Sequence, residues 1–533
     1  MKAIKTLGGI LVLLAGTAAC TGDGGTADGG DRAEYAEGGT YTTTLTSDPG
    51  NLHPLKAVQN TTNTVVAYAY DSLVFVNTDG EVVPRLASSW EATPSSVTFT
   101  LTEGVTCSDG TEVTASVVAD TFEWVKVPEN GSTVIGTSLP SPAYTVEADD
   151  DAGTVTITFK QPNGFLLEGA GMVPIVCPKG LADPTLLQSG TDGTGPFVLT
   201  DYAADDHLTL EAREGYTWGP DGASTDEPGF PAKVEIRVVP NLTTAVNLFL
   251  AGEITEVTPT SAEQPRLESR DAFTVETLQG PTDMFFNQRP GFPGEDPDVR
   301  RALTMALDLD QLAEVTTEGS GSPAEGLAIL RPRPCPGNTV EGHLPEHDPE
   351  GAATLLDETG WTVGSDGVRS RDGEPLQVTL GYVTGEEATA AGMELVRQWW
   401  EDIGVEVEPQ GQGQGAYIET LFGGTNWDAA FLPVQLIYPS QFKAFGSGPV
   451  PPDGQNFAAI TNDDYERLAT EAESTPTEDG GCELWAQAEQ ALFDNVDVVP
   501  VANTVTVTYA DNAEFTEGLT SLVEPTSIRL YAE

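Results

Sequence analysis

Two kinds of hydrophobic repeat alternate along this chain, and together they restrict it to a mixed fold of strands and helices. Residues 96–101 (SVTFTL) and 154–159 (TVTITF) alternate polar and apolar side chains, which predicts half-buried strands. Residues 297–313 repeat apolar side chains at helical spacing after Asp296, which predicts one helix with an aspartate N-cap. Residues 348–358 predict a second helix of the same design. No internal repeat is visible, so we expect an α/β or α+β fold.

Three local features refine this pattern. Asp348 and Pro349 are expected at the N-cap and the first position of the second helix. Asp109 and Gly110 fit a tight turn between a strand and a helix, because glycine tolerates a positive φ. Arg300 lies on a predicted helix whose opposite side is apolar. We therefore expect Arg300 to form a structural ion pair rather than to contact a ligand.

The N-terminal segment carries the pattern of an export signal. Lys2 and Lys5 precede the apolar run LGGILVLLAGTAAC, which ends in small residues and Cys20 and resembles a bacterial lipoprotein signal peptide. We expect a signal peptide over residues 1–20, with lipid on Cys20 holding the protein at the outer face of a membrane. The run is shorter than the about 20 residues that a membrane span needs. Thr17 stands where such signals usually carry leucine, and an ordinary secretory signal with a free cysteine is the alternative.

Composition limits both the partners and the number of lobes. Residues 21–39 are almost wholly Gly, Asp, Thr and Ala and predict a flexible linker. The roughly 500 residues that follow exceed what one core holds, so two or three lobes are expected. With 82 acidic against 24 basic residues, the formal net charge is -58. This charge excludes nucleic acid as a partner and predicts a solvated, self-repelling surface.

Four cysteines remain beyond Cys20: Cys107, Cys177, Cys335 and Cys482. An even number in an oxidising compartment predicts two disulfides. Of the three possible pairings we favour Cys107 with Cys177 and Cys335 with Cys482, because each pair then lies within one predicted lobe. A metal site is the alternative, but the sequence has no CxxC spacing.

The chain offers little to support catalysis, so neither an enzyme nor a cofactor is expected. Its four histidines include one close pair, in HLPEH, where Pro345 breaks the helix that would place both rings on one face. We expect those two histidines in an exposed loop and no metal site. No serine stands in a GxSxG motif, and the run GQGQG at 411–415 lacks the lysine of a phosphate-binding loop and predicts a plain loop. The histidines are His53, His207, His343 and His347.

The order of the segments resembles a known family. Residues 69–90 contain a tyrosine–aspartate pair, a proline, a leucine–alanine step and a tryptophan, followed by a strand, an aspartate–glycine turn and a helix. This region is similar to the extracellular solute-binding proteins of the oligopeptide, dipeptide and nickel-binding family, the family 5 substrate-binding lipoproteins of ABC transporters. Further blocks match the family in the same order: residues 193–219, 234–254, 285–312, 347–361, 396–409 and 488–509.

The resemblance implies a two-lobed, periplasmic-binding-protein-like fold with a hinge. Lobe I would comprise residues 40–80, 186–280 and 496–533, with residues 81–185 inserted as a subdomain, and lobe II would comprise 281–495. Solute would be enclosed between the lobes by hinge closure and delivered, without chemistry on it, to membrane permease subunits driven by ATPase subunits. We expect a monomer at the extracellular or periplasmic face of the cell membrane.

The solute is the least determined part of the resemblance. Peptide-binding members carry an aspartate that pairs with the free amino terminus of the peptide, and the corresponding run here, residues 433–442, has Gln435 at that position. A neutral amide cannot supply the ion pair that a buried cation needs. Oligopeptide or dipeptide import remains the leading hypothesis; import of a sugar or another non-peptide solute, and solute sensing without uptake, are the alternatives. The candidate ligand-binding residues are Gln435, Tyr438, Trp427, Tyr417 and Asn287.

Overall fold

The computed structural model describes residues 34–57, 59–135, 138–331, 333–384, 387–423, 426–477, 480–518 and 522–532. The predicted signal peptide, Cys20 and most of the predicted linker lie outside the described residues. Within residues 35–533 the chain forms one compact unit of mixed strands and helices. The expected fold class is confirmed, because helices pack on both faces of the largest sheet.

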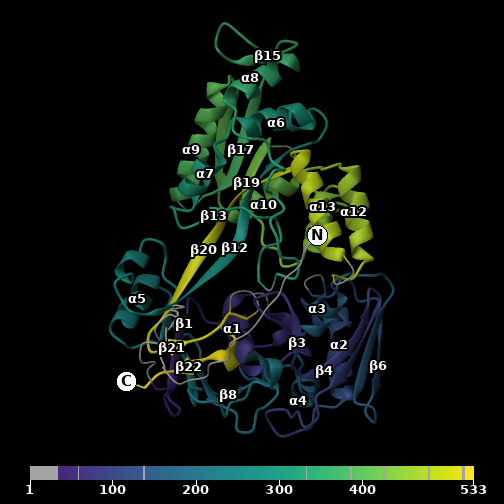
Figure 1. The fold of residues 1–533 in the computed structure, drawn as a ribbon, viewed down its shortest axis with the longest axis vertical. Helices are drawn as coiled ribbons and strands as arrows, with labels where there is room; N and C mark the ends of the chain where they lie inside the picture. The colour runs from purple at the N-terminus through teal and green to yellow at the C-terminus, as the bar shows by residue number, and fades with distance from the viewer. Residues whose placement is uncertain are drawn as a thin grey trace, which may run out of the picture. The chain divides into compact units, whose positions relative to one another are not determined.

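Two long antiparallel strands organise the second half of the chain (Figure 1). β12 (Phe273–Phe286) pairs with β20 (Val498–Ala510) along almost its whole length. They belong to a seven-stranded sheet that also contains β11 (Glu256–Val257), β13 (Ser322–Pro323), β17 (Gln377–Val383), β18 (Glu406–Gln412) and β19 (Ala429–Pro433).

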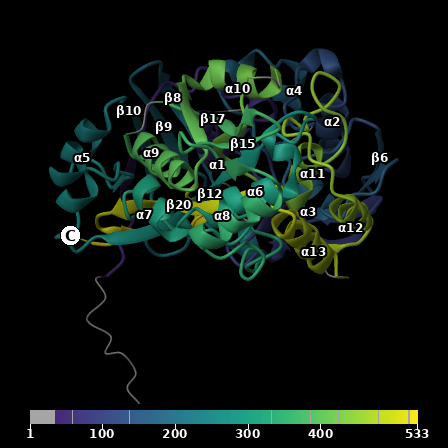
Figure 2. The same ribbon diagram turned by 90° about the horizontal axis from the view of Figure 1, so that it is seen from above.

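The faces of this sheet are covered by different helices because successive strand residues point to opposite sides. Met284 and Phe286 of β12 pack into one buried cluster, whereas Phe285 packs into the other. The first cluster is built with α6 (Pro297–Met305), α7 (Leu309–Thr316), α8 (Pro349–Glu358) and α9 (Glu387–Asp402). The second is built with α10 (Gln414–Gly423), α12 (Asp463–Glu473) and α13 (Gly481–Asp494), the last two lying side by side (Figure 2).

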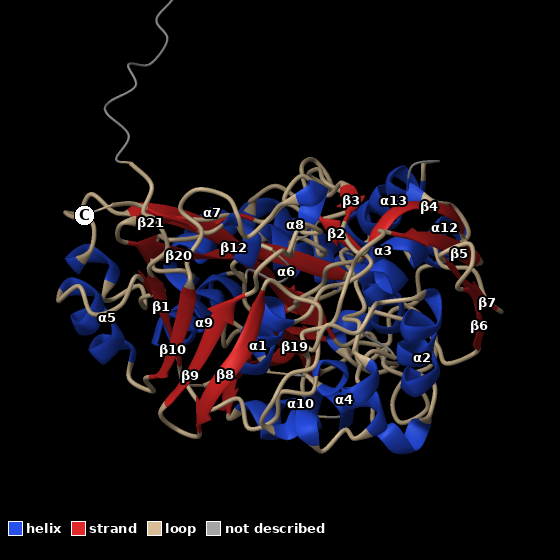
Figure 3. Cartoon of the chain, turned by 90° about the horizontal axis from the view of Figure 1, so that it is seen from below, coloured by secondary structure: helices blue, strands red, loops and turns tan. Residues whose placement is uncertain are grey.

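A four-stranded sheet carries the first strand of the chain. Its order is β1 (Thr40–Leu45), β10 (Lys233–Val238), β9 (His207–Ala212) and β8 (Phe197–Ala203), and the four strands lie side by side in Figure 3. β1 is parallel to β10 and the other neighbours are antiparallel. Near this sheet the chain forms α1 (Asn60–Ala69), α5 (Leu242–Leu250) and the small pair β21 (Ala513–Glu514) with β22 (Arg529–Leu530). Another small pair, β2 (Val74–Val76) with β3 (Val82–Pro84), instead contacts the segments that follow it in the chain.

All strands of a second four-stranded sheet lie in the range predicted for the inserted subdomain. Their order is β4 (Ala87–Thr93), β5 (Ser96–Leu101), β7 (Thr154–Phe159) and β6 (Tyr144–Asp149). β5 and β7 match the two strands predicted from alternation. The accompanying helices are α2 (Ala115–Val125), α3 (Leu166–Gly171) and α4 (Pro178–Ala182); elsewhere lie α11 (Lys443–Gly446) and the small sheet β14 (Thr362–Val363), β15 (Arg369–Arg371) and β16 (Glu374–Pro375).

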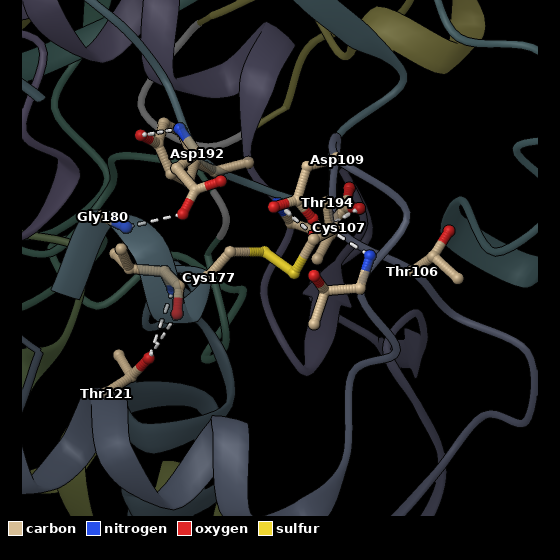
Figure 4. Close-up of a disulfide and its surroundings, with 12 residues drawn as sticks. Thr106, Cys107, Asp109, Thr121, Cys177, Gly180, Asp192 and Thr194 are labelled. Carbon is tan, nitrogen blue, oxygen red and sulfur yellow. Dashed lines mark hydrogen bonds between the residues drawn. A yellow bond between two sulfur atoms is a disulfide. The ribbon is translucent and has the colours of Figure 1, made fainter. Parts of the chain in front are cut away.

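The structure joins the cysteines in the favoured pairing. Cys107 is bonded to Cys177, with Cα atoms 6.1 Å apart, and Cys335 is bonded to Cys482. Beside the first disulfide, the carboxylate of Asp192 accepts a hydrogen bond from Gly180 N at 2.6 Å (Figure 4). The predicted turn at Gly110 is also present, with φ +87° and a bond from its N–H to Cys107 O.

The helix starts were predicted more accurately than one of the helix ends. The side chain of Asp296 caps α6, and that of Asp348 caps α8. The single helix predicted for residues 297–313 is wrong, because Asp308 interrupts it and its carboxylate caps α7 at Gln311 N. The loop predicted at residues 411–415 is also wrong: β18 extends to Gln412 and α10 begins at Gln414.

The structure shows no interruption of β12 at the predicted boundary between the lobes. The boundary at residues 280–281 falls inside β12, which runs through it without interruption. β12 therefore runs from the range predicted for lobe I into the range predicted for lobe II, and with its partner β20 it forms what we call the crossing strands. The lobe ranges themselves stay a prediction.

Arg300 forms the buried ion pair that the sequence predicts. Its guanidinium lies 3.1 Å from Asp497 Oδ1 and also donates to the carbonyl oxygens of Gly294, Asn495 and Val496. Arg300 is only 2% exposed and Asp497 is fully buried. The pair thus ties α6 to the start of β20.

Replacing Arg300 by leucine should strongly destabilise the protein. The substitution leaves Asp497 buried without its cation, which costs about 3–5 kcal/mol of unfolding free energy. Urea denaturation measures this loss. Arg301→Leu is the matched control: Arg301 is less buried and donates to Asp494 O, so less than about 1 kcal/mol should be lost. Equal losses for both variants would contradict the structural role of the Arg300 pair.

Candidate functional site

Three of the predicted ligand-binding residues, Tyr417, Trp427 and Asn287, lie in the protein interior. Tyr417 belongs to α10, and it packs with Trp427 in the cluster that also contains α12 and α13. Tyr417 is fully buried, and its hydroxyl donates to Gly381 O at 3.0 Å and to Phe431 O at 3.3 Å. Asn287 is fully buried and donates through Nδ2 to the carbonyl oxygen of Trp427 at 2.9 Å. The Tyr417 contacts join α10 to β17 and β19, and the Asn287 contact joins the residues that follow β12 to those that precede β19. Tyr417, Asn287 and Trp427 are thus buried as parts of the packed interior. Their role in ligand binding stays a prediction.

The other two predicted residues lie where the predicted subdomain meets the predicted lobe II. The ring of Tyr438 is 5.1 Å from that of Phe165, which in turn is 6.3 Å from that of Trp485. Nearby, Thr477 Oγ1 donates to Glu168 Oε1 at 3.4 Å. Gln435 is exposed. The structure therefore brings Tyr438 to a contact between the two ranges but leaves Gln435 open to solvent.

Gln435 follows a close approach of two strands. A Cβ at position 280 would lie 2.1 Å from Val434 O, so only glycine lets β12 pass there. Pro281 O then accepts a bond from Val434 N at 2.9 Å. This contact fixes the start of the segment that carries Gln435 and Tyr438 against the crossing strand.

A buried pair of carboxyl groups lies deeper along the same strand. Asp283 is fully buried, and neither of its carboxyl oxygens has a hydrogen-bond partner among the described residues. Glu489 of α13 is 6% exposed and accepts from Thr339 Oγ1 at 2.7 Å. Burial, with a smaller contribution from the charge of Glu489, raises the pKa of Asp283 well above its usual range. Burial therefore favours the protonated form of Asp283 in the folded protein.

A cavity of about 170 Å³ lies elsewhere, within the ranges predicted for lobe I. Its walls come from β1, α1, β20, the residues at and just after β11, and residues 515, 517, 522 and 523, which are far apart in sequence. None of the predicted ligand-binding residues lines it. Its lining consists of Thr43, Thr44, Thr64, Ala67, Tyr68, Glu256, Thr258, Thr508, Phe515, Glu517, Leu522 and Val523.

Two carboxyl groups give this cavity its electrostatic character. Glu256 Oε2 accepts a hydrogen bond from the hydroxyl of Tyr41 at 2.5 Å. Glu517 is 5% exposed, and its nearest cation is Arg331 Nη1, 3.5 Å from Oε2. Burial raises the pKa of Glu256, and it raises the pKa of Glu517 to about 7 although the charge of Arg331 acts against it. Because Arg331 lies in the predicted lobe II, this ion pair links the two predicted lobes beside the cavity.

Sequence reasoning missed this cavity and the Asp283–Glu489 pair. No local motif marks either group, since the residues that meet are separated by more than two hundred positions. Within the described ranges, no group of three or more His, Cys, Asp or Glu side chains is placed to hold a metal ion. No helix in that part of the chain combines the length and apolarity that a membrane span requires.

Comparison with known protein families identifies the family to which this chain belongs. Residues 81–447 match the model of the bacterial extracellular solute-binding proteins, family 5, middle region. The match covers more than half of the chain. The protein belongs to this family. It is therefore an extracellular solute-binding protein with a mixed fold of helices and sheets.

Individual relatives agree with this assignment. The oligopeptide-binding protein OppA of Bacillus subtilis is 23% identical over 96% of this chain and 95% of its own length. A substrate-binding protein from Microbacterium hydrocarbonoxydans, solved with 4-hydroxybenzoate hydrazide, is 26% identical with a TM-score of 0.67, covering 92% of this chain and 99% of that one. The ABC transporter substrate-binding protein CtaP of Listeria monocytogenes has a TM-score of 0.77 at 19% identity, covering 93% and 100%.

Replacing Asp283 by asparagine should make folding stability less sensitive to pH. The unfolded chain loses this proton near pH 4, whereas the raised pKa lets the folded protein keep it to higher pH, so between these two pKa values wild-type stability falls by up to about 1.4 kcal/mol per pH unit from this group. The asparagine variant lacks that loss. Urea denaturation at pH 5 and pH 8 should show a smaller decrease for Asp283→Asn than for wild type.

The exposed residue Glu276 of β12 provides the control, because Glu276→Gln should leave the pH dependence at the wild-type value. If Asp283→Asn and wild type lose equal stability between pH 5 and pH 8, Asp283 is ionised in the folded protein and the assignment fails.

Proposed function

We propose that this protein is the substrate-binding component of an ABC importer, and that it captures an oligopeptide or dipeptide between two lobes. The observation that carries the proposal is the family match over residues 81–447. The likeness to OppA over nearly the whole of both chains favours a peptide as solute. The bound peptide would pass to membrane permease subunits, and no reaction on the peptide is required.

The mechanism is closure about the crossing strands. An open and a closed form interconvert, and solute favours the closed form because it contacts both lobes only there. The Phe165 contact with Tyr438 and Trp485, and the Glu517–Arg331 ion pair, each join a segment of the first predicted lobe or its subdomain to the second. These contacts would form on closure and add to the stability of the closed state.

The lipid anchor and the partners belong to the same proposal. Lipid on Cys20 would hold the mature protein at the outer face of the cell membrane, with the linker after it giving reach to the permease. We propose a monomer in that setting. An adjacent pair of permease genes and ATPase genes would favour uptake, whereas a neighbouring sensor kinase gene would favour signalling.

A non-peptide solute is the second candidate. Gln435 replaces the aspartate that peptide-binding members use, and it is exposed here. The 26% identical relative was solved with 4-hydroxybenzoate hydrazide, which is not a peptide. Both observations favour a small solute other than an ordinary peptide. The first experiment should therefore identify the bound solute.

Mass spectrometry of the released solute tests the proposal. The protein is purified from its own host and denatured, and the small molecules set free are identified. A released peptide is the expected result. Adding it back at 100 times its dissociation constant should then raise the free energy of unfolding by about 2.7 kcal/mol. A released sugar or another non-peptide solute would overturn the peptide assignment and leave the importer assignment standing.

Shortening Phe165 to alanine should weaken solute binding by roughly tenfold, because the aromatic contact that favours the closed form is lost. Isothermal titration calorimetry with the released solute measures the change. Phe445→Ala is the control: Phe445 packs on Phe442 and Phe457, within the predicted lobe II, so stability should fall while affinity stays the same. Unchanged affinity in Phe165→Ala would count against closure through this contact.

A further inference from the structure

The cavity beside β1 has a chemistry that the family assignment leaves unexplained. We propose that it receives a positively charged amine of the solute, with the carboxylates of Glu256 and Glu517 as its counter-charges. This inference rests on the proposed solute-binding function and specifies the class of solute.

The size of the cavity fits one end of a solute. A volume of about 170 Å³ is similar to the roughly 150 Å³ of an engineered protein cavity that binds benzene. That volume holds an ammonium group with its adjoining carbon atoms, but not a whole peptide. The rest of the solute would extend toward the contacts between the two predicted lobes, which the Glu517–Arg331 pair reaches.

The lining is suited to a cation and unsuited to an anion. It contains two carboxyl groups and several threonine hydroxyls but no lysine or arginine among the described residues. Glu517 Oε2 is buried and accepts no hydrogen bond from the described residues. The nearest cation is Arg331, whose Nη1 lies 3.5 Å from this oxygen. An ammonium group, which is a donor of three hydrogen bonds, can satisfy carboxylate and threonine oxygens together.

Protonation explains how the half-buried Glu256 and the buried Glu517 are tolerated in the cavity without a ligand. The raised pKa values of Glu256 and Glu517 mean that protons hold part of their charge when no cation is present. The groups facing them are Arg331, beside Glu517, and the hydroxyls of Tyr41, Thr43 and Tyr68, beside Glu256. A bound ammonium would lower both pKa values, so binding near pH 7 should release protons.

The position used by other peptide-binding members cannot provide this charge. Gln435 is neutral and exposed. Asp283 is a buried acid on β12, but it interacts with Glu489 in the packed interior and does not line the cavity. The buried Glu517 and the half-buried Glu256 are therefore the acids that line open space.

The test compares three sets of probes by calorimetry on the full chain freed of bound solute. They are di- and tripeptides with free amino termini, the same peptides N-acetylated, and non-peptide primary diamines such as putrescine. Binding of the free peptides but not of their acetylated forms is the expected result. In two buffers of different ionisation enthalpy, the binding heats should differ in the direction of proton release.

Isosteric variants locate the charge. Glu256→Gln and Glu517→Gln should each weaken binding of the free peptides by roughly 30-fold or more, as expected when one partner of a buried charge pair is neutralised. Proton release should diminish in the same variants. Glu276→Gln on the exposed side of β12 is the matched control and should bind as wild type. Thermal denaturation verifies that each variant folds, and the proton-release measurement on wild type needs no variant.

The outcomes separate this inference from the proposed function. Binding of diamines but not peptides upholds the cationic cavity and overturns the peptide function. Equal binding of free and acetylated peptides upholds the peptide function and overturns the cationic cavity, as does loss of binding in Asp283→Asn with wild-type binding in both cavity variants. Binding of none of the probes overturns both.

Discussion

The pairing of β12 with β20 is the constraint on which the rest of the structure depends. It extends from Phe273 opposite Ala510 to Phe285 opposite Val498, and its register shifts twice, on either side of Pro281 and Thr282. Such irregularities bend a strand and interrupt its ladder of hydrogen bonds. They lie where the predicted lobe boundary crosses the strand, beside the glycine that admits Val434. The pairing of β12 with β20 is thus irregular at the point where the proposed closure would bend it.

A second constraint fixes the base of the first predicted lobe. The carboxylate of Asp71 accepts hydrogen bonds from Thr194, Tyr216 and Trp218, each at 3.0 Å, and Arg85 lies 2.7 Å from it. A buried carboxylate is tolerated only when its charge is paired and its oxygens are satisfied, and both conditions hold here. The tyrosine–aspartate signature of residues 69–90 and the block at 193–219 are therefore two halves of one polar core. The two blocks therefore occur together because their side chains form one interaction.

Local features were predictable from the sequence because local physics decides them. Alternation placed β5 and β7 correctly, and Asp296 and Asp348 marked the helix starts because a short acidic side chain can bond the free N–H groups there. The same physics explains the error at residues 306–308, since Asp308 is an equally good cap and apolar spacing alone cannot reveal a second helix start. The cavity was beyond such reasoning. Glu256 and Glu517 are two of 82 acidic residues, and only tertiary burial distinguishes them from the others.

The surface and the interior use negative charge in different ways. A net charge of -58 attracts cations from a distance, but salt screens such attraction beyond about 8 Å at physiological ionic strength. The surface can therefore speed the encounter with a cationic solute without selecting one. Selection requires carboxylates that water and salt do not reach, and Glu517 is buried in this way. An acid whose pKa lies near 7 exchanges a proton for a cation at little net cost, which makes the same group stable when empty and attractive to an amine. The discrimination between solutes would then be decided inside the cavity, at the end of the crossing strands where Thr508 lines its wall.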